Sequence, residues 1–77
     1  MPTKIENAQE MSVVRIVEMY PDDYILVQIV TRDITGIPLY TSKERLDLVR
    51  LVQNLNIATD TIIMEGENFD VRLGGLL

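Results

Sequence analysis

One short run, residues 24–30, constrains the fold of this chain more than any other part of its sequence. Every residue in the run except Gln28 is apolar or aromatic. Alternate side chains of a strand point to opposite faces, so a strand with one wet face alternates between apolar and polar residues. This run is apolar at both parities and rich in β-branched valine and isoleucine. We therefore expect a central strand that is covered on both faces.

Turn-forming residues bound this run, and a second strand follows it. Residues 21–23 form the preceding turn, and the segment from Asp33 to Gly36 reads as a hairpin loop in which the glycine supplies the left-handed conformation. Residues 37–41 then form the returning strand. Because Pro38 has no backbone N–H to donate, the sequence predicts that the returning strand lies at the edge of the sheet.

Residues 11–20 have the spacing of an amphipathic helix. Their apolar side chains recur at intervals of three and four, with Asn7 as the expected N-cap and Pro21 as the residue that ends the helix. The three valines of this segment are β-branched, so an extended conformation stays open as the alternative.

Residues 42–55 give a stronger helical pattern. The predicted buried stripe consists of Leu48, Leu51, Val52 and Leu55. The preceding residues, 41–44, match a capping box, in which the side chain of Glu44 reaches back to the backbone N–H of the cap residue. Residues 59–64 read as a third strand, 65–68 as a turn and 69–73 as a short further strand.

These elements fit one topology. A right-handed strand–helix–strand connection makes the second and third strands parallel and leaves the slot between them for residues 24–30, antiparallel to both. The predicted fold class is α+β: a small (α)ββαβ(β) domain over residues 11–77, with a mainly antiparallel sheet of order 2-1-3 and one helix packed on a face. The other face is covered either by the helix of residues 11–20 or by a second molecule. Residues 1–10 are expected to be a flexible N-terminus.

The amino-acid composition argues against several classes of function. The 77 residues include no cysteine and no histidine, which argues against disulfides, thiol chemistry, zinc binding and the usual general base. The net charge of -5 disfavours nucleic acid and anionic membrane surfaces as partners. The first ten residues have no apolar signal core, and residues 24–30 are too few to span a bilayer. We expect a cytoplasmic protein.

A resemblance supports the same fold. The opening Tyr20-Pro21-Asp22-Asp23-Tyr24, the aliphatic strand after it and the later Ser42-Lys43-Glu44-Arg45 resemble a group of small uncharacterised bacterial proteins that are common in cyanobacteria. The resemblance implies a strand, a hairpin and a Ser-capped helix, and it brings no catalytic residue and no settled activity. The chain departs from that pattern at residues 37–40, which replace a longer aliphatic return.

The polar side chains offer two candidate cation sites. They gather around Glu18, Asp22 and Asp23, and around Glu65, Glu67, Asn68 and Asp70. Neither group has the regular ligand spacing of a calcium loop, so both are interpreted as solvated turns. No catalytic, cofactor-binding or metal-binding residue is predicted, and we expect no enzyme activity and no cofactor.

Two hypotheses for the function of this protein remain, and in both it acts on or with other proteins. The first is a small non-catalytic protein–protein interaction or self-association module whose partner is a second copy, in a homodimer, or another protein. Its predicted interface consists of Tyr24, Leu26, Gln28, Val30, Leu39 and Tyr40. The alternative is a ubiquitin-like or sulfur-carrier-like protein processed at Gly74-Gly75, which follow Arg72-Leu73. That alternative requires removal of Leu76 and Leu77.

Overall fold

The computed structural model describes residues 1–55 and 60–69. In these ranges the chain order is β1 (Thr3–Lys4), β2 (Met11–Ser12), α1 (Val13–Met19), β3 (Tyr24–Thr31), β4 (Thr35–Ser42), α2 (Arg45–Leu55) and β5 (Thr61–Glu65). The described strands form one 5-stranded antiparallel sheet of order β1-β4-β3-β5, with β2 also paired to β4. The predicted α+β fold is confirmed, and so is the order of its three main strands, β4-β3-β5. No helix in the described ranges is long and apolar enough to cross a membrane.

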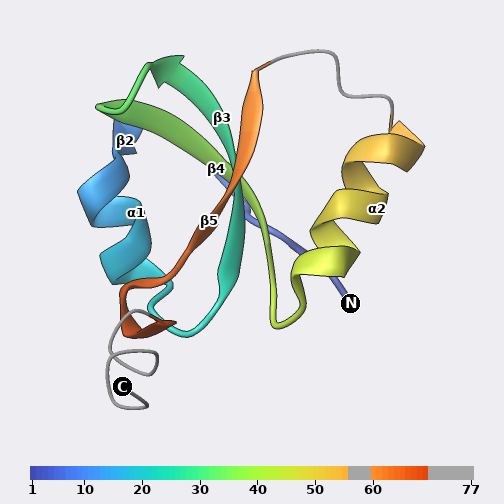
Figure 1. The fold of residues 1–77 in the computed structure, drawn as a ribbon. Coiled ribbons are helices and arrows are strands. Elements are labelled where there is room, and N and C mark those ends of the chain that lie inside the picture. The colour runs from blue at the N-terminus through green and yellow to red at the C-terminus, as the bar shows by residue number, and fades with distance from the viewer. Residues whose placement is uncertain (56–59, 70–77) are drawn as a thin grey trace.

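The central strand β3 is covered on both faces, as its apolar run predicts. Ile25, Leu26 and Val27 are each 0% exposed. Ile25 and Val27 pack with Ile16 of α1 on one face, and the neighbouring side chain Leu26 points to the other face, where α2 lies. Figure 1 shows the two helices on opposite sides of the sheet. The helix of residues 11–20 therefore covers β3 within the same chain.

The start of α1 differs from the prediction. Its N-cap is Ser12, whose hydroxyl oxygen accepts a hydrogen bond from the Arg15 N–H at 3.2 Å. Asn7, the predicted cap, lies in a turn with a φ of 55°. The helix begins late because Met11 and Ser12 pair with β4 as β2, and paired residues are extended.

The hairpin between β3 and β4 also assigns its residues differently. Asp33, with a φ of 63°, supplies the left-handed residue of the turn, and Gly36 lies inside β4 without a positive φ. A Cβ at position 36 would lie 2.5 Å from Cγ1 of Val27 and 2.9 Å from the carbonyl oxygen of Gln28. Glycine is needed there because β3 approaches closely, and the turn does not depend on it.

The outer side of β4 is covered, which corrects the prediction that this strand lies at the sheet edge. β1 pairs with Tyr40 and Thr41, and β2 pairs with Thr35 and Gly36. The backbone N–H of Ile5 donates to the Leu39 carbonyl at 2.9 Å. Residues 1–10, for which we expected no regular structure, thus provide most of this cover. Pro38 falls between the two short strands, where its missing N–H leaves no ladder bond unmade.

The turn into α2 replaces the predicted capping box. The Ser42 hydroxyl accepts from the Glu44 N–H at 3.1 Å and donates to Oδ2 of Asp47 at 2.9 Å. α2 then begins at Arg45. The carboxylate that completes this turn is therefore Asp47 and not Glu44, because Asp47 lies one helical turn further on and faces the Ser42 hydroxyl.

Candidate interaction surface

Two turns that are far apart in the sequence form one corner of the molecule. The Gly66 N–H donates to the Asp23 carbonyl at 2.9 Å, and the Asn68 N–H donates to the Pro21 carbonyl at 3.0 Å. A Cβ at position 66 would run into the backbone carbonyl groups of Tyr20 and Pro21. This corner fixes the end of β5 against the turn that precedes β3.

The carboxylates of this corner bind protein groups. Oδ1 of Asp22 accepts a hydrogen bond from the side-chain amide of Asn68 at 2.9 Å. Nζ of Lys43 lies 2.7 Å from Oδ1 of Asp23. Across the described residues, no three carboxylates are grouped so that they would hold a cation. Asp22 and Asn68, one from each of the two polar groups, thus join the turn before β3 to the segment after β5.

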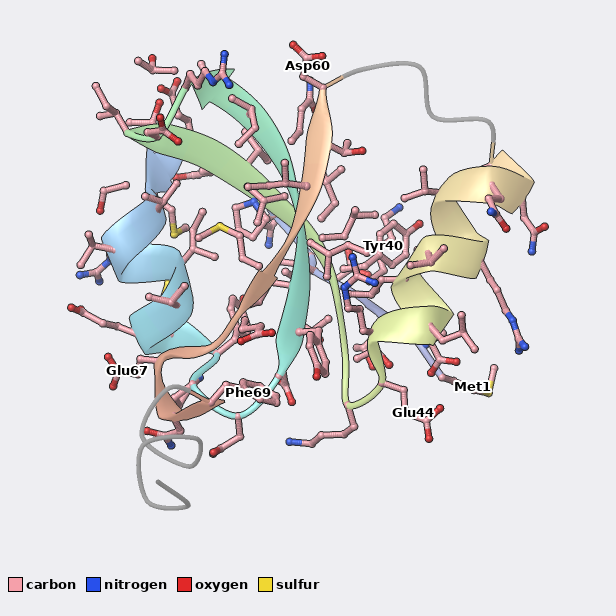
Figure 2. All side chains as sticks on the ribbon, in the orientation of Figure 1. Met1, Tyr40, Glu44, Asp60, Glu67 and Phe69 are labelled. Carbon is pink, nitrogen blue, oxygen red and sulfur yellow. The ribbon has the colours of Figure 1, made fainter. Side chains whose placement is uncertain are left out.

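The six predicted interface residues lie on β3 and β4, but they do not form one open surface. Leu26 is 0% exposed and has no area to offer a partner. Tyr40 is paired with Leu26 across the ladder and lies between the sheet and α2 (Figure 2). The ring of Tyr24 packs against Phe69, with ring centroids 4.6 Å apart. Of these three residues, Leu26 is buried and the two tyrosines are partly covered.

The other three predicted residues are Gln28, Leu39 and Val30. Gln28 and Leu39 are partly exposed, and Val30 is 47% exposed. Leu39 is the extra residue of one β-bulge, since Leu26 pairs with Tyr40 and Val27 with Pro38. Val30 lies at the second register shift, between Ile29 and Thr31. Bulged residues leave the regular alternation of faces, so spacing alone misplaces them.

α2 covers only part of its face of the sheet. Leu48 is fully buried, but Leu55, the last residue of the predicted stripe, is 52% exposed. A groove of about 530 Å³ remains between α2 and β5. Its apolar lining includes Val49, Val52 and Ile63, and its polar lining consists of Arg45, Gln53 and Thr61. The groove lies directly beside the outer strand β5.

The backbone of β5 faces β3 on one side, and no described strand pairs with its other side. The Ile29 N–H donates to the Asp60 carbonyl at 2.8 Å, and the register runs without a shift from there to Glu65. Hydrogen-bonded positions alternate along an antiparallel strand, so even-numbered residues of β5 turn their N–H and C=O groups to β3. Thr61, Ile63 and Glu65 turn theirs to the open edge.

The side chains of these same three residues lie on the face that α2 covers. Ile63 is directly opposite Leu26, and directly opposed side chains share a face of the sheet. Within the described residues, the edge lacks three of the usual protections against pairing with another chain, which are proline, lysine and a β-bulge. Residues 61–65 contain no proline and no lysine, and their pairing with β3 contains no bulge. Backbone groups and apolar side chains are thus presented together.

The described part of the molecule also has a charged contact at the start of α2. The ammonium group of Met1 lies 3.3 Å from Oδ2 of Asp47, and Figure 2 labels Met1 at this end of the helix. The hydrogen bond from the Ser42 hydroxyl, followed by that from the ammonium group, holds the pKa of Asp47 below its ordinary value. This contact ties the segment that covers β4 to α2, on the side of the sheet away from β5.

Sequence reasoning missed Ile63 and the groove beside it, although one signal was available. In a sheet of order 2-1-3 the third strand is necessarily an edge, and the sequence from Thr61 to Glu65 shows that this edge carries neither proline nor lysine. The extent of the groove had no such signal, because it depends on how far α2 extends over the sheet.

Two predictions lie outside the described residues. The short strand over residues 69–73 falls there except for Phe69, which the structure places in a helical turn over residues 67–69 and not in a strand. The Gly74-Gly75 sequence of the carrier-protein hypothesis also falls there. Comparisons with protein-family models, with curated proteins and with solved structures found no match to this chain.

Proposed function

We propose that this protein is a small non-catalytic interaction module that binds another polypeptide chain along the open edge of β5. The observation that supports this proposal is the outward-facing backbone of Thr61, Ile63 and Glu65 beside an apolar groove. An unpaired strand edge binds an extended chain through main-chain hydrogen bonds, and a neighbouring pocket selects the side chains at alternate positions. The groove supplies such a pocket on the face of α2.

The chemistry of the groove supports a binding role. Its polar side chains are Arg45, Gln53 and Thr61. Arginine and glutamine cannot accept a proton at neutral pH, and the threonine hydroxyl has no neighbouring base in this lining to activate it. Val49, Val52 and Ile63 provide the apolar area that favours burial of a partner's aliphatic or aromatic side chains.

A displayed library of short extended peptides, selected on the immobilised full chain, tests this proposal. We expect selected peptides with apolar residues at alternate positions, because only every second side chain faces the groove. Ile63→Lys should weaken their binding at least about tenfold, since it places a charge at the centre of the edge. The matched control is Leu46→Lys, at a residue of α2 that is 54% exposed and outside the groove lining.

Amide hydrogen exchange gives the second measurement. Binding along the edge should slow exchange at Thr61, Ile63 and Glu65, whose N–H groups point outward, more than at Ile62 and Met64, which already bond to β3. Peptides that keep their affinity for Ile63→Lys, or that protect none of the outward amides, would contradict the proposal.

A further inference from the structure

Resting on the proposed function, we infer that the chain bound at this edge is β5 of a second copy, paired antiparallel about a two-fold axis at Ile63. The outward-facing residues are spaced symmetrically around Ile63, with Thr61 on one side and Glu65 on the other. Antiparallel pairing about this axis sets Ile63 opposite Ile63 of the second copy. It also sets Thr61 of each copy opposite Glu65 of the other, so every outward N–H and C=O finds a partner.

The positions of the outward-facing residues in β5 favour this register over its neighbours. Moving the axis by one residue, to Ile62 or to Met64, keeps outward groups facing outward groups but leaves one outward residue of each copy unpaired. Unpaired N–H and C=O groups in a closed interface are unfavourable. The register about Ile63 is therefore the favoured one, because it pairs all three outward residues of each copy. A parallel arrangement would instead set Glu65 beside Glu65, and like charges opposite each other destabilise a pair of strands.

The side chains fit the same register on both faces of the joined sheet. On the α2 face, the two Ile63 side chains meet at the axis and the two grooves become continuous, lined by Val49 and Val52 of each copy. On the α1 face, Ile62, which is 45% exposed in the single chain, lies opposite Met64 of the second copy. Apolar side chains therefore meet apolar side chains on both faces.

Charge is also compatible with self-pairing. Glu65 is the only charged residue between Thr61 and Glu65. In the two-fold register its carboxylate faces the Thr61 hydroxyl of the second copy, on the face where Gln53 lines the groove. The Thr61 hydroxyl and the Gln53 side-chain amide both donate hydrogen bonds, and neither group carries a charge.

Light scattering of the full chain over a dilution series tests the inference. We expect a mass of two chains at high concentration, falling toward one on dilution. Ile63→Lys should raise the dimer dissociation constant at least about tenfold, because two lysines would meet at the axis. Leu46→Lys, with the same charge change away from the edge, should dimerise like the parent chain. Circular dichroism confirms that both variants are folded.

The register is tested by cysteine cross-linking, which is clean because the chain has no cysteine of its own. Opposed residues of an antiparallel pair have Cα atoms about 5.5 Å apart, within reach of a disulfide. Ile63→Cys should oxidise to a covalent dimer, and a mixture of Thr61→Cys with Glu65→Cys should cross-link more than either variant alone. Leu46→Cys is the control and should stay monomeric under the same oxidation.

The two proposals fail separately. A parent chain that is monomeric at every concentration, or monomeric until residues 70–77 are removed, overturns the second-copy inference, while peptides that bind at the edge still support the proposed function. A dimer that Ile63→Lys leaves intact, together with no edge-binding peptide, overturns both. Cross-linking at Leu46→Cys as efficient as at Ile63→Cys also overturns the register.

Discussion

The two outer strands of the main sheet, β4 and β5, end the sheet in opposite ways. β4 carries a proline, a buried glycine and a bulge, and two short N-terminal strands cover its outer side. β5 has a regular register with β3, no proline or lysine, and no described strand on its outer side. Exposed edges invite pairing with other chains, and natural proteins normally protect them. This difference between the two edges is the reason that we propose β5, and not β4, as the strand that binds a partner.

The two strands are also held differently. β4 has hydrogen-bonded neighbours on both sides, whereas β5 pairs with one of the described strands and has an anchored end at Gly66. In Figure 2 the labelled Asp60 lies just before β5 and the labelled Glu67 lies just after it. A strand with one ladder opens at a lower free energy than a strand between two, so β5 should be the more easily opened edge until a partner covers it.

The largest effect is expected where β5 is anchored. Gly66→Ala puts a Cβ into the backbone carbonyl groups of Tyr20 and Pro21, and backbone cannot move aside as a side chain does. We expect a loss of more than about 3 kcal/mol in the free energy of unfolding, measured by urea denaturation. Glu67→Ala, at the exposed neighbour, should stay within about 0.5 kcal/mol. Equal stability of the two variants would show that the corner does not hold β5.

At the protected edge, the corresponding change is smaller. Gly36→Ala brings a Cβ to 2.5 Å from Cγ1 of Val27, a side-chain atom that can shift, and to 2.9 Å from the Gln28 carbonyl oxygen. We expect a loss of about 1 to 3 kcal/mol in the free energy of unfolding, measured in the same denaturant series. Ile34→Ala, at a hairpin residue that is 59% exposed, is the matched control and should have little effect. A stabilising Gly36→Ala would mean that β4 and β3 are not held this closely.

Much of the fold was predictable from residues 24–30, because an apolar run at even and odd positions that is rich in β-branched residues and bounded by turns favours a strand covered on both faces. That run, the hairpin after it and the strong pattern of residues 42–55 together determine the order β4-β3-β5. The two-residue strands β1 and β2 were not predictable, since a periodicity needs more residues than they contain. Without them, the outer side of β4 looked open in the sequence.

The candidate surface was predicted less well, for a related reason. Tyr24, Leu26 and Tyr40 share a face, as their alternation predicts, but α2 and Phe69 lie over that face. Spacing tells which side chains share a face and does not tell how far a neighbouring helix extends over it. Gly36 shows the same limit, because a glycine needed for close contact and a glycine needed for a left-handed turn look identical in a sequence.

A further effect on stability is expected in the N-terminal segment that covers the outer side of β4. Ile5→Pro takes away the N–H that donates to the Leu39 carbonyl at 2.9 Å and shortens a side chain that packs against the α1-side core. We expect a loss of about 1 to 2 kcal/mol in the free energy of unfolding, from one hydrogen bond and part of one aliphatic side chain. Ile5→Val, which keeps the N–H, should lose less. If the two variants unfold together, packing alone holds the cover and the hydrogen bond contributes nothing.

The smallest expected effect is a pH dependence confined to the covered edge. The Ser42 hydroxyl and, second, the Met1 ammonium group lower the pKa of Asp47 in the folded protein. A carboxyl whose pKa is lowered by folding adds stability that is complete above its ordinary pKa of about 4 and is lost as the pH falls through the lowered value. In acid, amide exchange should therefore quicken at Ile5 relative to the amides of β5.

In an NMR titration, Ser42→Ala should raise the Asp47 pKa more than acetylation of the N-terminus does. Lys43→Ala, which removes a contact with Asp23, should leave the Asp47 pKa unchanged. A larger rise on acetylation would make the ammonium group the main anchor of the cover over β4.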